Sequence, residues 1–128
     1  TILPKLKTDF VKLIAACVNK NLSSINLEWY DDKSLCIVLC SKGYPEIYKN
    51  SIEIKNLKDI KLNQNEFIFH AGTKKEKNKI LSNGGRVLNF VIRSDSFKNN
   101  REKAIDLINK INWENGFFRK DIGHKVID

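Results

Sequence analysis

Methionine is absent from this sequence of 128 residues, and cysteine is scarce, with three residues. Because translation normally starts with methionine and this sequence starts at Thr1, we expect a processed product or a piece of a longer protein. An odd number of cysteines, two of them inside an apolar run, does not suit a disulfide framework. We therefore expect free thiols and a cytoplasmic location.

Long apolar runs are missing as well. The longest strongly apolar stretch is residues 35–40, far short of the ~20 residues that a membrane helix needs. No basic and then apolar segment marks a secretory start, so we expect no membrane association. Hydrophobic residues make up 41% and charged residues 30% of the chain, which is typical of a globular domain and excludes wholesale disorder.

Positive charge is what the sequence has in excess. Lys and Arg number 23 against 15 Asp and Glu, which gives a net charge of +8. This balance favours anionic partners, whether phosphates, nucleotides or nucleic acid, without choosing among them. The lysine-rich residues 74–79 lack the interleaved aromatic side chains that stack on nucleic-acid bases, so we interpret them as a solvated hairpin tip and expect no nucleic acid.

Two amphipathic helices and several strands are indicated. Apolar residues recur at helical spacing from Leu6 to Val18, with Thr8 as the expected N-cap, and again at 104–111 in a helix capped by Ser96. Alternating or apolar runs predict strands at residues 25–29, 35–40, 52–54, 66–70 and 86–93. Helix, antiparallel strands and helix without regular βαβ alternation indicate an α+β fold.

The apolar run at residues 35–40 predicts a central strand with both of its cysteines buried. Cys36 and Cys40 lie four positions apart on that strand, roughly 13 Å at ~3.3 Å per residue. That separation excludes a single zinc ion gripped by both thiolates. We therefore interpret the two cysteines as core residues and expect no metal site and no catalytic residue.

Two short segments have both a structural and a functional interpretation. His70, before Ala71-Gly72-Thr73, is either satisfied by the backbone at a strand end or stands beside a turn of small residues where Thr73 offers a hydroxyl to a ligand. Asn83-Gly84-Gly85 is a strong hairpin signal. Followed by Arg86, it is also a candidate anion cradle, with exposed N–H groups beside a guanidinium.

Five short segments occur in a characteristic order and spacing: Leu3–Asp9, Ser41–Lys49, Phe69–Thr73, Asn83–Leu88 and Phe118–Gly123. Together they resemble the C-terminal part of the phosphoribosylamine–glycine ligases, also called glycinamide ribonucleotide synthetases, a family of ATP-grasp enzymes. The resemblance spans almost the whole chain. Lys5 and Lys120 depart from it, because the family usually has Arg at both positions.

The resemblance implies a fold, a domain division and an activity. Residues 1–24 would be the last helix of an ATP-grasp lobe, and residues 25–128 a small antiparallel, barrel- or sandwich-like domain with one long helix. The intact enzyme would be an ATP-dependent carbon–nitrogen ligase of purine biosynthesis that joins glycine to 5-phosphoribosylamine. ATP and Mg²⁺ would bind to residues that precede this chain, which should hold no cofactor, be inactive alone and contact the remainder of its own polypeptide.

The resemblance also favours the functional interpretation of the two short segments. It implies that Asn83, Gly84, Gly85 and Arg86 face a phosphate of the substrate or nucleotide. It adds His70, Gly72 and Thr73 as further candidates for substrate binding. It implies that the first helix leaves apolar surface exposed in this chain. The alternative function is a stand-alone basic module that binds nucleotides or RNA.

Overall fold

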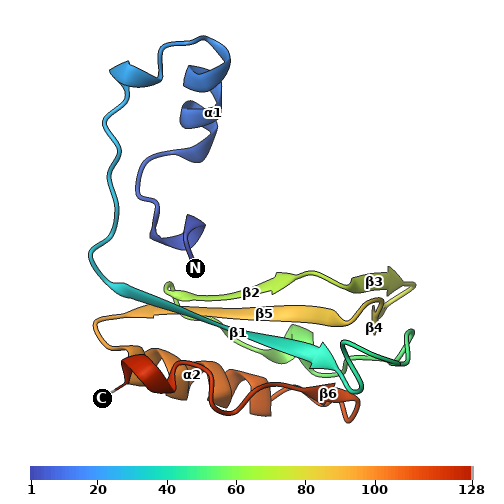
Figure 1. Ribbon diagram of the computed structural model, residues 1–128. Helices are drawn as coiled ribbons and strands as arrows, with labels where there is room; N and C mark the ends of the chain where they lie inside the picture. Colours follow the sequence, from blue (N-terminus) through green and yellow to red (C-terminus); the bar gives the residue numbers. More distant parts are fainter. Residues whose placement is uncertain (128) are drawn as a thin grey trace.

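The computed structural model describes residues 1–127, which form two parts (Figure 1). The arm, residues 1–32, carries helix α1 (Phe10–Val18). The body, residues 33–127, is a sheet with helix α2 (Phe97–Asn109) against one face. The arm projects from the side of the sheet opposite α2. The fold is α+β, as the sequence predicts.

The main sheet is antiparallel and has the strand order β2-β5-β1-β6. Its two long central strands are β1 (Lys33–Ser41) and β5 (Arg86–Ser94). They pair from Lys33 opposite Ser94 to Cys40 opposite Arg86, with a register shift after Leu39. The outer strands are β2 (Glu66–His70) and the short β6 (Gly116–Phe117). The strand predicted at residues 66–70 is confirmed.

The lysine-rich segment forms a second, two-stranded sheet of β3 (Thr73–Glu76) and β4 (Lys79–Ser82). Since β2 leads into β3 and β4 leads into β5, the four strands make one long hairpin with a kink. Its tight turn is at residues 77–78, where Lys77 has a φ of 52°. The hairpin turn predicted at Asn83-Gly84-Gly85 is therefore wrong. Residues 74–79 form the solvated tip of a hairpin, as predicted, although most of them pair as strands.

The core lies between the main sheet and α2. In β1, Leu35, Ile37 and Leu39 are buried, whereas Cys36 and Cys40 on the other face are only partly buried. The prediction of a central strand at residues 35–40 is confirmed, but the full burial of its cysteines is wrong. The reason is that α2 covers one face of the sheet alone, so an apolar run does not require two covered faces.

Helix α2 follows the sequence prediction closely. The Ser96 side chain accepts a hydrogen bond from the Asn99 N–H at 3.4 Å, as an N-cap does. Ala104, Leu107 and Ile108 of its apolar stripe are buried. The segment predicted as a weak strand at residues 52–54 is extended, with a single bridge from Glu53 to Leu81 on β4.

Three predictions for the arm need correction. Helix α1 begins at Phe10, not Leu6, because the Asp9 side chain, not that of Thr8, accepts the Lys12 N–H at 2.9 Å. The strand predicted at residues 25–29 is wrong. Its alternating residues meet no sheet and form one bridge, between Leu6 and Trp29.

The expectation that α1 exposes apolar surface is confirmed. Phe10, Ile14 and Val18 are exposed, and Ala16 is the one residue of the helix that is buried. Within residues 1–127 no helix has the length and apolarity needed to cross a membrane.

Candidate functional site

The kink of the long hairpin brings together all seven residues that the sequence marked as candidates. At this point the chain segment 70–73 lies against the segment 83–86. The Gly72 N–H donates to the Arg86 carbonyl at 2.9 Å, and the Asn83 N–H donates to the Gly72 carbonyl at 2.8 Å. A Cβ at Gly72 would stand 2.7 Å from the Arg86 carbonyl oxygen. Glycine is therefore required here for the two segments to approach.

Ser41, the buried last residue of β1, fixes the glycine pair in place. Its N–H donates to the Gly85 carbonyl at 2.7 Å, and its hydroxyl donates to the Gly84 carbonyl at 2.8 Å. Within residues 1–127 the N–H groups of Gly84 and Gly85 donate to no protein acceptor. The carbonyls of this turn are thus occupied, whereas its N–H groups have no protein acceptor. Neighbouring N–H groups of this kind are typical of anion sites.

An open hollow of ≈ 450 Å³ lies beside this turn, and Arg86 is its one charged lining residue. The lining consists of Val38, Tyr44, Ala71, Gly85, Arg86 and Asn89. Among the described residues no carboxylate lies within 4 Å of the Arg86 guanidinium, and Asp121 pairs with Arg119 at 2.6 Å. An exposed guanidinium without a protein partner presents a planar fork of donors, which suits a phosphate or carboxylate.

Tyr44 is a lining residue that the sequence analysis missed. A side chain at Gly85 would overlap the Tyr44 ring, so the ring packs directly on the backbone of the turn. The signal was present, because Tyr44 lies in the segment Ser41–Lys49 that carries part of the family resemblance. No chemical motif in that segment pointed to a role. Asn89, opposite Val38 across the sheet, had no sequence signal at all.

His70 and Thr73 lie at the kink but outside the hollow. The His70 Nδ1 and the Thr73 Oγ1 are 2.9 Å apart, so the imidazole is satisfied by a side-chain hydroxyl and not by the backbone. His70 stands opposite Leu88, on the face of the sheet that α2 covers, whereas Arg86 stands opposite Cys40. The pair therefore supports the kink from the side away from Arg86.

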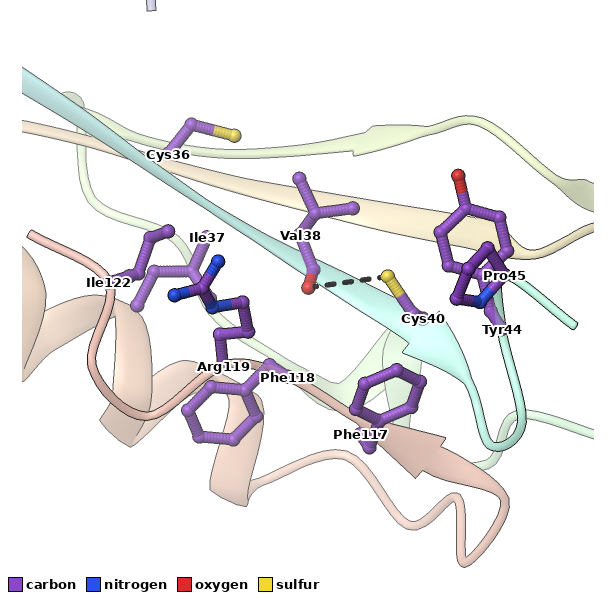
Figure 2. Close-up of a pocket in the computed structure, with 10 residues that line it drawn as sticks. All are labelled: Cys36, Ile37, Val38, Cys40, Tyr44, Pro45, Phe117, Phe118, Arg119 and Ile122. Atoms are coloured by element: carbon purple, nitrogen blue, oxygen red, sulfur yellow. Dashed lines mark hydrogen bonds between the residues drawn. The ribbon is translucent and has the colours of Figure 1, made fainter.

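A second cavity, of ≈ 340 Å³, follows β1 and shares Val38 and Tyr44 with the hollow (Figure 2). The rings of Phe117 and Phe118 lie along one side of the strand, and Tyr44 lies at its end. The cavity is mostly apolar, and the two shared lining residues place it next to the candidate anion site.

The thiols of Cys36 and Cys40 line this second cavity. Burial raises the pKa of both thiols, and for Cys40 the positive charge of Arg86 partly offsets that rise. Both sulfurs are therefore protonated near neutral pH, which disfavours metal binding and nucleophilic attack. Within residues 1–127 no group of three or more His, Cys, Asp and Glu side chains is placed to hold a metal ion.

Comparison with known proteins adds an independent result. Residues 34–125 match the family described as "Phosphoribosylglycinamide synthetase, C domain". A phosphoribosylamine–glycine ligase of Caldanaerobacter subterraneus subsp. tengcongensis is 45% identical over 94% of this chain, and the chloroplastic one of Arabidopsis thaliana is 33% identical over 98%. The chain spans 28% and 24% of the lengths of these two relatives.

A solved structure shows a similar fold. The crystal structure of the phosphoribosylamine–glycine ligase from Thermotoga maritima matches with a TM-score of 0.64 and 26% sequence identity. The match covers 84% of this chain and 27% of that one. The likeness therefore extends over both sequence and fold, for a segment of the longer relatives.

Proposed function

Because the chain belongs to the phosphoribosylglycinamide synthetase C-domain family, we propose that it is the C-terminal domain of a phosphoribosylamine–glycine ligase. The intact enzyme would form a carbon–nitrogen bond between glycine and 5-phosphoribosylamine with conversion of ATP to ADP and phosphate. The names of relatives that align with 94–98% of this chain support the proposal. They favour it over the alternative of a stand-alone nucleotide- or RNA-binding module.

The part assigned to this chain is to hold the substrate's phosphate. Arg86 would bind it through the guanidinium, with the N–H groups of Gly84 and Gly85 as additional donors next to Asn83. The observation that carries this proposal is an Arg86 without a carboxylate partner, in a hollow beside two N–H groups without protein acceptors. His70, Gly72 and Thr73 would form the support that keeps the kink in shape.

The proposal leaves ATP and Mg²⁺ to the remainder of the polypeptide, because the resemblance places their ligands in residues that precede this chain. Among residues 1–127 no group of three or more His, Cys, Asp and Glu side chains is placed to hold a metal ion. The exposed apolar face of α1 supports the further proposal that residues 1–24 complete an ATP-grasp lobe. A cytoplasmic location suits the three free thiols.

The direct test is Arg86→Ala in the full-length polypeptide, with steady-state kinetics for each of the three substrates. Loss of a charge-assisted hydrogen bond costs roughly 1.5–3 kcal/mol. At ~1.4 kcal/mol per decade, the KM for 5-phosphoribosylamine should rise about ten- to a hundred-fold. Arg86→Lys should recover part of the loss, because it keeps the charge without the fork.

Arg119→Ala is the matched control, because Arg119 is exposed and paired with Asp121. It should leave all three KM values and the melting temperature unchanged. Unchanged kinetics in Arg86→Ala would refute the assigned role of Arg86. A full-length polypeptide that forms no ADP in the presence of glycine and 5-phosphoribosylamine would refute the ligase itself.

A further inference from the structure

Arg93 stands at the opposite end of β5 from Arg86 and holds the arm. Its side chain is 8% exposed. The Nε donates to the Asp32 Oδ2 at 2.9 Å, and the Nη1 donates to the Pro4 carbonyl. The guanidinium carbon lies 3.9 Å from the centroid of the Tyr30 ring. An ion pair, a hydrogen bond and a cation–π contact thus meet on one side chain.

The three partners come from two antiparallel segments at the base of the arm, joined around the single bridge between Leu6 and Trp29. The Tyr30 N–H donates to the Lys5 carbonyl at 2.9 Å, and the Lys7 N–H donates to the Glu28 carbonyl at 3.0 Å. These bonds join residues 5–7 to residues 28–30. Arg93 therefore holds both segments, since it contacts Pro4 on the incoming one and Tyr30 and Asp32 on the outgoing one.

Little else connects the arm to the body. Within residues 1–127, every hydrogen bond between residues 1–32 and residues 33–127 has the Arg93 side chain as its donor. Open hollows of ≈ 400 Å³ and ≈ 350 Å³ lie around this joint, one lined in part by Trp29 and Phe97, the other by Arg93 and Asn65. Broad side-chain packing therefore does not set the direction of the arm.

We propose that Arg93 is a positioning residue, a clamp that fixes the direction of the arm relative to β5. Strand β5 is paired along both edges, with β1 and with β2, so it is a stiff connection. Arg93 and Arg86 are seven residues apart on it, roughly 23 Å at ~3.3 Å per residue. In consequence, and here the inference rests on the proposed function, the clamp holds the ATP-grasp lobe at a set distance from the substrate phosphate.

The chemistry explains why this position takes arginine. A planar guanidinium stacks on the Tyr30 ring while its edge donates to Asp32 and Pro4. The ammonium of lysine carries the same charge but makes neither the stack nor the two directed bonds together. Arg93→Lys should therefore fail as a clamp although the charge of the chain is unchanged.

A distance measurement on this chain tests the clamp without any assay of activity. With Cys36→Ala and Cys40→Ala as background, spin labels on Cys17 of α1 and on Lys98→Cys of α2 report the distance between arm and body by pulsed electron spin resonance. The background chain and Arg119→Ala, whose Arg–Asp pair is exposed, should give one narrow distance peak. Arg93→Ala and Arg93→Lys should lose that peak to a broad distribution.

A narrow peak retained in Arg93→Ala, or a broad distribution already present in the background chain, would overturn the proposal. If circular dichroism shows that Arg93→Ala does not fold, Tyr30→Leu replaces it. This substitution removes a contact of Arg93 from the side of the arm and leaves the body unchanged. Retention of the narrow peak in Tyr30→Leu would then overturn it.

Kinetics of the full-length polypeptide test the consequence separately. Arg93→Ala should lower kcat with a smaller change in the KM for 5-phosphoribosylamine. Arg86→Ala should instead change mainly this KM. Inactivity of the parent polypeptide would refute the proposed function. The distance measurement would still show whether Arg93 fixes the direction of the arm. Unchanged kcat in a variant with a broad distance distribution would refute the coupling to the substrate site.

Discussion

The arm and the body use the same kind of apolar residue in opposite ways. Ile37 in the body is 1% exposed, whereas Ile14 in the arm is 49% exposed. Both belong to regular apolar patterns, one on a strand and one on a helix. The difference teaches that a pattern specifies which face is apolar, but the rest of the fold decides whether that face is covered.

The largest contrast should appear when these two isoleucines are truncated. Ile37→Ala removes a fully packed side chain and should lower the free energy of unfolding by about 2–5 kcal/mol. Ile14→Ala should change it by no more than ~0.5 kcal/mol. Urea denaturation of this chain measures both. Similar losses for the two variants would mean that the arm shares the core of the body.

A polar residue allows the second contrast. Asn100 on α2 is fully buried, accepts from the Ser94 hydroxyl at 2.6 Å and donates to the Lys33 carbonyl at 3.0 Å. Asn100→Ala leaves these groups without their partner and should cost about 1–3 kcal/mol. Asn99→Ala, at the exposed neighbouring position, is the control and should be nearly neutral in the same denaturation experiment.

The cysteines give a third contrast, in reactivity. Cys17 in the arm is exposed, whereas burial raises the pKa of Cys36 and Cys40 in the body. Because the thiolate is the reactive form, iodoacetamide should modify Cys17 several-fold faster near neutral pH, as peptide mass spectrometry can follow. The rates at Cys36 and Cys40 should keep rising at alkaline pH.

Arg86→Ala should change the iodoacetamide labelling rate of Cys40 alone. Removal of the positive charge raises the pKa of Cys40 further, so its thiolate fraction should fall, while Cys36 serves as the internal control. Equal labelling rates at all three cysteines would contradict the described burial.

The smallest effect is expected at the edge of the body. Partial burial alone would raise the pKa of Glu66, but hydrogen bonds from the Asn63 side chain and N–H, at 2.9 and 3.0 Å, hold this pKa below its ordinary value. A lowered pKa in the folded state means stability that is present above the unfolded-state pKa and is lost as the pH falls through the folded one.

Glu66→Gln should therefore cost roughly 0.5–1 kcal/mol near pH 6, a size typical of partly exposed charge interactions. The cost should shrink toward pH 3. Glu102→Gln, at an exposed position of α2, is the control. Denaturation curves at the two pH values decide, and a cost for Glu66→Gln that does not depend on pH would contradict the assigned cause.

The sequence predicted what depends on local pattern. The cap at Ser96, the buried stripe of α2 and the strand at residues 66–70 follow from rules that act within a few residues. The resemblance singled out residues 70–73 and 83–86 separately. In the fold these two segments lie side by side, so the seven candidate residues are brought together.

What the sequence did not predict depends on distant partners. Asn83-Gly84-Gly85 has the chemistry of a tight turn, yet residues 77–78 make the turn and the glycines allow a close approach to Gly72. The alternation at residues 25–29 suits a strand, but no sheet edge is present for it to join. Arg93 and Asn100 had no signal. The side-chain partners of Arg93 lie at least 61 residues away, and Asn100 reaches the Lys33 carbonyl only once α2 is packed on the sheet.

The central claim is that the body folds on its own, whereas the arm is held only at its base. The apolar face of α1 is left for another surface to cover. Amide hydrogen exchange of this chain, followed residue by residue by NMR, measures it most directly. We predict that amides in the middle of β1 and β5 exchange only through global unfolding, and that those of α1 exchange orders of magnitude faster. Protection of α1 equal to that of β5 would contradict the account, because it would show a helix that needs no further partner.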